Sequence, residues 1–160
     1  MKFFTLFFLA VAVAAVAFPS PEVVAPDFES AELLAGVKGL PGKTIVCAKN
    51  RFTAKQIRNV ANATLRHISN KSIKTSDTGV SYPHRYNYKD PHVKLSKSCK
   101  KGDELYEFPI ESHGVWRGGS VRHIPDRIVL KGKLGKKDAT YCGLITHTGA
   151  TGNGFKSCSG

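Results

Sequence analysis

Four cysteines constrain the fold of this chain more than any other feature of its sequence. They are Cys47, Cys99, Cys142 and Cys158, and none of them forms a C-x-x-C pair of the kind that binds zinc. In a secreted protein an even number of cysteines predicts disulfides, so two bridges are expected, with three pairings open. A bridge from Cys47 to Cys158 would tie the ends of the domain together. Closing so long a loop contributes about 4–5 kcal/mol in the chain-entropy model.

The amino-terminal segment predicts secretion. Residues 1–17 read MKFFTLFFLAVAVAAVA, with a positive charge at Lys2, an apolar stretch and small residues at Ala15 and Ala17. This is the layout of a signal peptide, and cleavage is expected near Ala17. A membrane helix needs about 20 apolar residues, and Pro19 and Glu22 interrupt this run too early.

Charge divides the remaining chain into two parts. Residues 18–42 are acidic and proline-rich, with a formal charge of −3, and are interpreted as either a propeptide or a disordered arm. Residues 43–160 contain 22 of the 24 Lys and Arg residues and eight of the 12 acidic residues, a formal charge of +14. This length suits one compact domain with one modest core. Its charge suits a polyanionic partner: nucleic acid, acidic polysaccharide or an anionic surface.

The spacing of apolar residues predicts one helix and several short strands. Between residues 53 and 68 apolar side chains recur at helical spacing, and Thr53 is a suitable N-cap. Strand-like runs follow at 105–110, 126–130 and 141–147, separated by turn-rich segments. This order predicts an α+β fold in which the helix packs on one face of an antiparallel sheet. The opposite face is then free to bind a partner.

Four polar residues in or beside the strand-like runs are candidates for chemistry: His84, Glu107, Arg127 and His147. Strand alternation places Glu107 opposite Phe108 and Arg127 opposite Ile128, so both polar side chains point away from the helix-packed core. Each residue alone has a plainer interpretation. A single glutamate is usually a solvated edge residue, and Arg127 directly follows Asp126, as in a surface ion pair.

Together these four residues suit the cleavage of RNA by its own 2′-hydroxyl. That reaction needs a base for the 2′-hydroxyl proton, an acid for the departing 5′-oxygen and a cation beside the phosphoryl oxygens. Histidine and glutamate transfer protons near neutral pH, and arginine bonds two oxygens at once. The reaction requires no metal ion or other cofactor. A non-catalytic RNA-binding effector is the alternative from a different functional class, although such a binder does not need all three groups.

Several segments, in this order, resemble the fungal guanyl-preferring extracellular ribonucleases, a family that includes the ribotoxins. The resemblance runs from about residue 47 to 158 and rests on SYPHRYN (81–87), LYEFPI (105–110), GGS (118–120), DRIVL (126–130) and GLITHTGATGNGF (143–155). It implies one helix on a twisted antiparallel sheet whose concave face binds RNA.

The resemblance also implies catalytic roles. Glu107 would be the general base, assisted by His84, and His147 would be the general acid. Arg127 would neutralise the phosphoryl oxygens, and Tyr82 would line the phosphate and ribose pocket with Phe155. The implied product is a 2′,3′-cyclic phosphate that is slowly hydrolysed to a 3′-phosphate.

The base-binding residues implied by the resemblance are Asn87 and Asn153, which hold guanine largely through backbone groups. Tyr86, Tyr88 and Phe155 are either base-stacking platforms or rim and core aromatics. After YPHRYN the loop is one residue shorter than in the family, whose glutamate pairs with guanine. Here Asp90 replaces that glutamate, or Lys89 occupies its place and weakens the preference for guanine.

The cysteine arrangement resembles that of the ribotoxins and implies the pairs Cys47–Cys158 and Cys99–Cys142. The chain nevertheless lacks their long amino-terminal hairpin and long lysine-rich loop. We therefore expect a secreted, monomeric general ribonuclease of single-stranded RNA, with cytotoxicity and entry into target cells as further hypotheses. Ribosome-specific cleavage is the alternative. No stable membrane association is expected.

Overall fold

The predicted helix is present. The computed structural model describes residues 36–160, so the predicted signal peptide and most of the acidic segment lie outside the described residues. Helix α2 (Ala54–Asn70) begins with a capping box: Thr53 Oγ1 accepts from Gln56 N, and Gln56 Oε1 accepts from Thr53 N at 2.8 Å. It ends at Lys71, whose backbone is left-handed (φ 52°). Thr53 is thus confirmed as the N-cap, and the helix runs two residues further than predicted.

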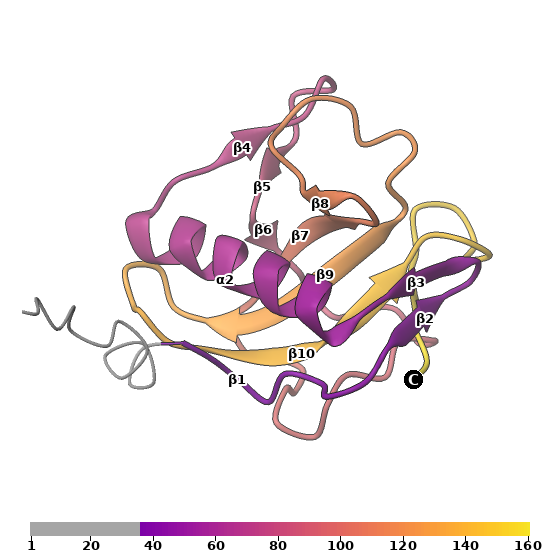
Figure 1. Cartoon of the computed structure of the whole chain (residues 1–160), viewed down its shortest axis with the longest axis horizontal. Coiled ribbons are helices and arrows are strands. Elements are labelled where there is room, and N and C mark those ends of the chain that lie inside the picture. Colours follow the sequence, from indigo (N-terminus) through magenta and orange to yellow (C-terminus); the bar gives the residue numbers. More distant parts are fainter. Residues whose placement is uncertain (1–35) are drawn as a thin grey trace, which may run out of the picture.

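A twisted sheet packs behind this helix (Figure 1). Its strand order is β1-β10-β9-β7-β6, with β11 added to β10 and β8 to β7. These strands are β1 (Val37–Lys38), β6 (His84–Arg85), β7 (Leu105–Glu111), β8 (Gly114–Val115), β9 (Asp126–Gly132), β10 (Ala139–Thr146) and β11 (Lys156–Ser157). Two hairpins stand apart, β2 (Ile45–Cys47) with β3 (Asn50–Phe52), and β4 (Lys74–Thr75) with β5 (Ser81–Tyr82). All pairings between the named strands are antiparallel except β1 with β10, so the predicted α+β fold is confirmed.

Strand β1 lies within residues 18–42, the acidic segment interpreted above as a propeptide or a disordered arm, and it is part of the sheet. Val37 pairs with Ala139 and Lys38 with Thr140, in parallel, at the edge of the sheet. Val37 and Leu40 also pack against the main core. The folded part of the described chain therefore includes residues that precede position 43.

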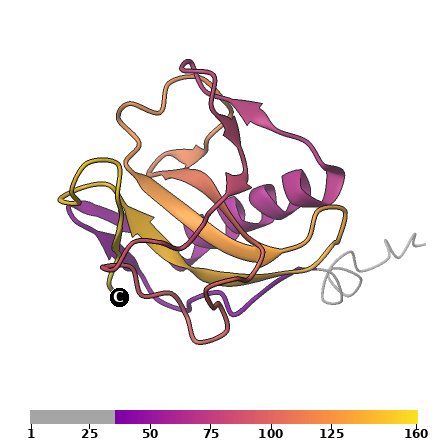
Figure 2. The same cartoon turned by 180° about the vertical axis from the view of Figure 1, so that it is seen from behind.

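Two separate cores explain why the sheet is buried on both faces. The larger core lies between α2 and the sheet and contains Phe108, Ile128 and Trp116. The smaller core covers part of the opposite face, where the segment 86–99 crosses Leu105 and Val129 (Figure 2). The face opposite α2 is therefore free only in part. Apolar side chains on that face need cover, and only the remainder is open to a partner.

Both disulfides have the pairing that the resemblance implied. Cys47–Cys158 joins β2 to the carboxyl-terminal segment, and Cys99–Cys142 fastens the covering segment to β10. In the part of the chain that the structure describes, no helix has the length and apolar character that crossing a membrane requires.

Candidate active site

Strand register brings the four candidate catalytic residues onto one face of the sheet. His84 lies directly opposite Glu107, and Arg127 lies between Pro109 on β7 and Ile145 on β10. Cross-strand partners share a face, and Glu107 shares its face with Pro109 two residues on. His147 follows Ile145 by two residues, just past the end of β10, which continues the same alternation. These four residues form a row across β6, β7, β9 and the end of β10, on the face of the sheet opposite α2.

Glu107 and His84 form a direct pair. The His84 Nε2 and Glu107 Oε1 atoms are hydrogen-bonded across β6 and β7. Glu107 is only 5% exposed, whereas the side chain of His84 is about a third exposed. The second carboxylate oxygen, Oε2, is buried without a partner among the described residues. A carboxylate that is held at one oxygen and free at the other can accept a proton from a bound hydroxyl.

Arg127 is a fixed cation at the floor of the site. It is 4% exposed, and its Nη1 donates to the carbonyl oxygens of Ile124 and Asp126. Its Nη2 donates to Tyr82 Oη at 3.4 Å, and the Tyr82 ring stacks on His84 with centroids 4.7 Å apart. The guanidinium is therefore held in place by neutral oxygens, and no carboxylate of residues 36–160 forms an ion pair with it.

The interpretation of Arg127 as half of a surface ion pair is wrong. The Asp126 carboxylate is buried and accepts from Asn50 Nδ2 at 2.6 Å. Only the backbone carbonyl of Asp126 contacts the guanidinium. The two side chains of a consecutive pair leave a strand on opposite faces, so they do not meet.

His147 is oriented by the glycine-rich loop that follows it. Its Nδ1 lies 2.9 Å from the carbonyl oxygen of Gly154, which requires Nδ1 to carry a hydrogen, and its ring lies against Phe155 at 3.8 Å between centroids. Nε2 is then the nitrogen that exchanges a proton. Burial lowers the pKa of His147 from its usual 6.5, the Gly154 carbonyl and Glu107 act to raise it, and Arg127 acts to lower it.

The aromatic candidates gather at one end of this row, around Asp90. Tyr86 and Tyr88 stack with centroids 6.1 Å apart, and Phe155 meets Tyr86 edge-on at 5.8 Å. Asp90 Oδ1 accepts from Phe155 N at 3.0 Å, and Oδ2 accepts from Tyr86 Oη at 3.2 Å. Burial raises the pKa of Tyr86 well above its usual value of 10, and the Asp90 carboxylate adds to this. Tyr86 and Phe155 are buried, so they form the base of this end rather than a free stacking surface.

Close approach of two loops explains one glycine of the carboxyl-terminal motif. A Cβ on Gly154 would lie 2.9 Å from Asp90 Oδ1, so a side chain at this position would displace the Asp90 carboxylate. Asn87 and Asn153 are exposed on the loops that flank this contact, and Lys89 is also exposed. The structure therefore gathers Asp90 with the aromatic residues and leaves Lys89 in solvent.

A family model described as ribonuclease matches residues 41–159. The chain belongs to the ribonuclease family. Its relatives include guanyl-specific ribonuclease F1 of Fusarium fujikuroi, which is 37% identical over 114 residues, covering 71% of this chain and 76% of the relative.

Two further members of the ribonuclease family match along nearly their whole length. Guanyl-specific ribonuclease Th1 of Trichoderma harzianum is 37% identical over 120 residues, 73% of this chain and 98% of the relative. Extracellular guanyl-specific ribonuclease Fl1 of Gibberella baccata is 34% identical over 113 residues, 71% of this chain and 93% of the relative. The family model, which matches residues 41–159, covers every residue of the candidate site.

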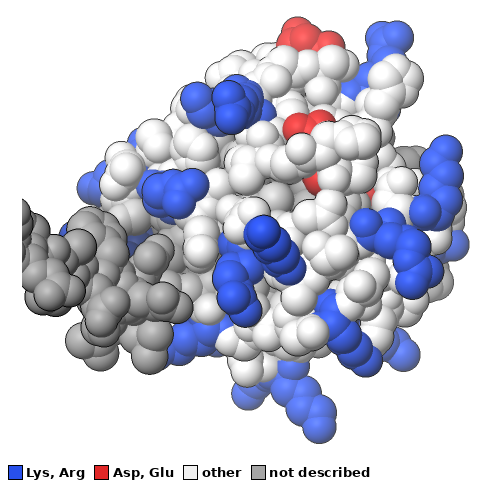
Figure 3. Space-filling view, in the orientation of Figure 1, with Lys and Arg blue, Asp and Glu red and all other residues white. Residues whose placement is uncertain are grey.

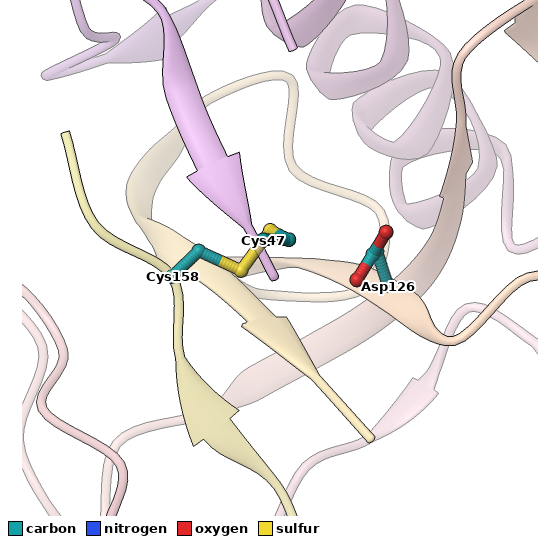
Figure 4. Close-up of side chains that lie close together, drawn as sticks. All are labelled: Cys47, Asp126 and Cys158. Atoms are coloured by element: carbon teal, nitrogen blue, oxygen red, sulfur yellow. A yellow bond between two sulfur atoms is a disulfide. The ribbon is translucent and has the colours of Figure 1, made fainter. Parts of the chain in front are cut away.

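One cluster of side chains that the sequence did not indicate consists of Cys47, Asp126 and Cys158. Asp126 lies beside the Cys47–Cys158 disulfide (Figure 4), and its Oδ1 has no partner among the described residues. Three such side chains can hold a metal ion, but here the two sulfurs are bonded to each other and have no thiolate to offer. The cluster is therefore structural. The only signal for it was an aspartate directly before the arginine.

Because burial lowers the pKa of His147, we expect the free energy of unfolding of the protein to depend on pH. Its pKa is lowered on folding, so the unfolded chain binds the proton more tightly, and the free energy of unfolding contributed by this residue rises with pH until about 6.5. Urea unfolding at several pH values should show the protein gaining stability relative to His147→Gln across this window, with no further gain above it. A difference that falls as the pH rises would contradict the assignment.

Proposed function

We propose that the protein is a secreted endoribonuclease that cleaves single-stranded RNA on the 3′ side of guanine through a 2′,3′-cyclic phosphate. The single observation that carries the proposal is the shared sheet face of Glu107, Arg127 and His147, with His84 opposite Glu107. The ribonuclease family model and the relatives named as guanyl-specific, one of them also as extracellular, support it.

Each group has one role in the proposed transesterification. Glu107, assisted by His84, takes the proton from the ribose 2′-hydroxyl, and the 2′-oxygen forms a new bond to phosphorus. The bond from phosphorus to the 5′-oxygen breaks, and His147 Nε2 gives its proton to that oxygen. Arg127 offers a fixed positive charge to the phosphoryl oxygens. In the slower second stage, water replaces the departed 5′-hydroxyl and the two proton transfers run in reverse, which yields a 3′-phosphate.

Asp90 is the proposed acceptor for guanine. A carboxylate has about four lone-pair positions, and Phe155 N and Tyr86 Oη use one each. The positions that remain suit the N1 and N2 hydrogens of guanine, which adenine does not present together. Lys89, the alternative occupant, is exposed and has no acceptor to offer. Tyr88 is held beside Asp90 by the bond from Leu95 N to its hydroxyl, so it is placed to stack on the bound base.

The test compares GpC with ApC, two dinucleoside monophosphates that differ only in the base to be recognised. We expect the protein to release guanosine 2′,3′-cyclic phosphate and cytidine in the presence of EDTA, and to cleave ApC far more slowly. The variant Asp90→Asn, which replaces an acceptor with a donor, should lose about 1–3 kcal/mol of this discrimination, a factor of about 5–150. Chromatography of the products measures both.

Two outcomes would contradict the proposal. One is a folded, purified protein that leaves GpC intact but binds RNA, which would instead indicate a non-catalytic effector. The other is a protein that leaves naked RNA intact yet releases one discrete fragment from ribosomes, which would indicate a ribotoxin-like, cytotoxic activity. The formal charge of +14 on residues 43–160 is compatible with either partner.

A further inference from the structure

A basic segment beside the site has no role in the chemistry described so far. Residues 111–125, hereafter the basic arm, connect β7 to β9 and include β8. The arm has one carboxylate, Glu111, against two arginines and two histidines, all four of them exposed: His113, Arg117, Arg122 and His123. Such a local excess of cations attracts phosphate groups.

The basic arm is held in a defined shape. Gly119 N donates to Thr75 O at 3.1 Å, and Gly119 O accepts from Asp77 N at 3.1 Å, so this part of the arm is fastened to the loop beyond β4. Ile124 N donates to Val121 O at 3.0 Å, which closes a tight turn with Arg122 and His123 at its two central positions. Both side chains therefore stand at a corner, exposed to solvent.

The last two residues of the arm form hydrogen bonds with two of the candidate catalytic residues, Arg127 and His147. The Ile124 carbonyl accepts from Arg127, and the Pro125 carbonyl accepts from His147 N at 3.0 Å. His147 is the proposed donor to the departing 5′-oxygen. The nucleoside that carries this oxygen, and the RNA that follows it, must therefore leave the site on the side of His147, where the basic arm ends.

A cavity of about 510 Å³ opens within the arm. Its lining includes His113, Trp116, Arg117 and Ser120, together with Glu111. The Trp116 ring meets Tyr82 edge-on at 5.3 Å between centroids, and the Tyr82 hydroxyl in turn accepts from Arg127. The Trp116 Nε1 hydrogen is buried and has no acceptor among the described residues. A cavity of this size, whose lining carries Arg117 and neutral donors beside one carboxylate, suits a nucleotide rather than an apolar ligand.

We propose that the basic arm binds the RNA downstream of the cleaved bond, with Arg122 and Arg117 contacting the phosphates that follow the scissile one. This inference rests on the proposed function, because it requires the direction of departure set by His147. The single carboxylate of the arm, Glu111, does not cancel two arginines. The consequence is that a longer substrate gains affinity only when it is extended on its 3′ side.

The test uses three substrates with the same cleavable bond. GpC has only the scissile phosphate, GpCpCpC adds two phosphates downstream, and CpCpGpC adds two upstream. In the double variant Arg117→Gln, Arg122→Gln we expect kcat/KM for GpCpCpC to fall about two- to fivefold for each arginine, the size of an exposed ion pair. GpC and CpCpGpC should be cleaved as by the unaltered protein.

Two controls sharpen this experiment. The variant Arg58→Gln, Arg66→Gln removes the same charge from exposed positions on α2, which packs on the face of the sheet opposite the site, and it should leave all three substrates unaffected. Figure 3 shows Lys and Arg side chains spread over the α2 side of the molecule. Binding of a GpCpCpC analogue with 2′-deoxyguanosine, which lacks the attacking hydroxyl, should lose about 0.7 from its log–log salt slope for each phosphate contact removed.

The outcomes separate the two proposals. Equal losses on GpC and GpCpCpC, or no loss on either, would overturn the downstream binding site while leaving the ribonuclease activity in place. A larger loss on CpCpGpC than on GpCpCpC would also overturn it, because the arm would then hold the upstream strand. Failure of the folded, unaltered protein to cleave GpC would instead refute the proposed function.

Discussion

Replacing His147 with glutamine is expected to lower kcat/KM for GpC by about 10²–10⁴-fold, the usual contribution of a general acid. His147 is held by Gly154 and Phe155 with Nε2 as its exchangeable nitrogen, and the amide of glutamine is not acidic enough to give up a proton. The activity of the unaltered protein should fall as the pH rises through the pKa of His147, because the protonated imidazole is the reacting form. This decline should be absent from the variant's pH profile.

A substrate with a good leaving group distinguishes acid catalysis from structural damage. In guanosine 3′-(4-nitrophenyl phosphate) the leaving group is 4-nitrophenolate, which needs no proton. The variant His147→Gln should therefore cleave this ester nearly as well as the unaltered protein does. Equal losses on this ester and on GpC would contradict the assignment of His147 as the acid. Circular dichroism and thermal unfolding of the variant show whether the fold is intact.

Replacing Arg127 with lysine is expected to lower kcat by about 10²–10³-fold, as removal of one preorganised donor from a charge-stabilising site does elsewhere. Lysine keeps the charge but has a single ammonium group, which cannot bond two phosphoryl oxygens while it is also held by Ile124 and Tyr82. KM should change much less than kcat, because the charge on phosphorus grows in the transition state. Steady-state kinetics on GpC measures both parameters.

Arg85 supplies the matched control for this substitution. It lies on β6 beside His84 but pairs with Tyr106, on the other face, and its guanidinium meets Glu104 at 3.2 Å in solvent. Arg85→Lys should therefore leave kcat within about twofold, the scale of an exposed ion pair. An equal effect of the two substitutions would show that Arg127 acts through general charge or stability rather than through its fixed contacts.

Much of the fold was predictable because it follows from local rules. Thr53 caps the helix, and the apolar positions of α2 recur at the spacing that buries one stripe. The alternation in β7 and β9 was correct, so Glu107 and Arg127 share a face away from the main core. The disulfide pairing came from the family resemblance, since cysteine spacing alone left three possibilities.

The rest depends on contacts between distant segments. Strands of two residues, such as β1 and β6, have no periodicity to detect, and only their partners define them. The second core forms because segment 86–99 folds over Leu105 and Val129, and no local sequence pattern predicts this contact. The Asp90 carboxylate accepts hydrogen bonds from both Tyr86 and Phe155. The second of these could not be predicted locally, because Phe155 lies 65 residues away in the sequence.

The Cys47–Cys158 bridge closes the backbone into a ring that contains every residue assigned to the reaction. The secreted enzyme that we propose would meet proteases, and a single nick in an exposed loop would open this ring without releasing either fragment. Cys99–Cys142 forms a smaller ring around Glu107 and Arg127, so a cut there would leave the pieces joined twice. Digestion must therefore sever the chain at least twice before any peptide that carries a reacting group can escape.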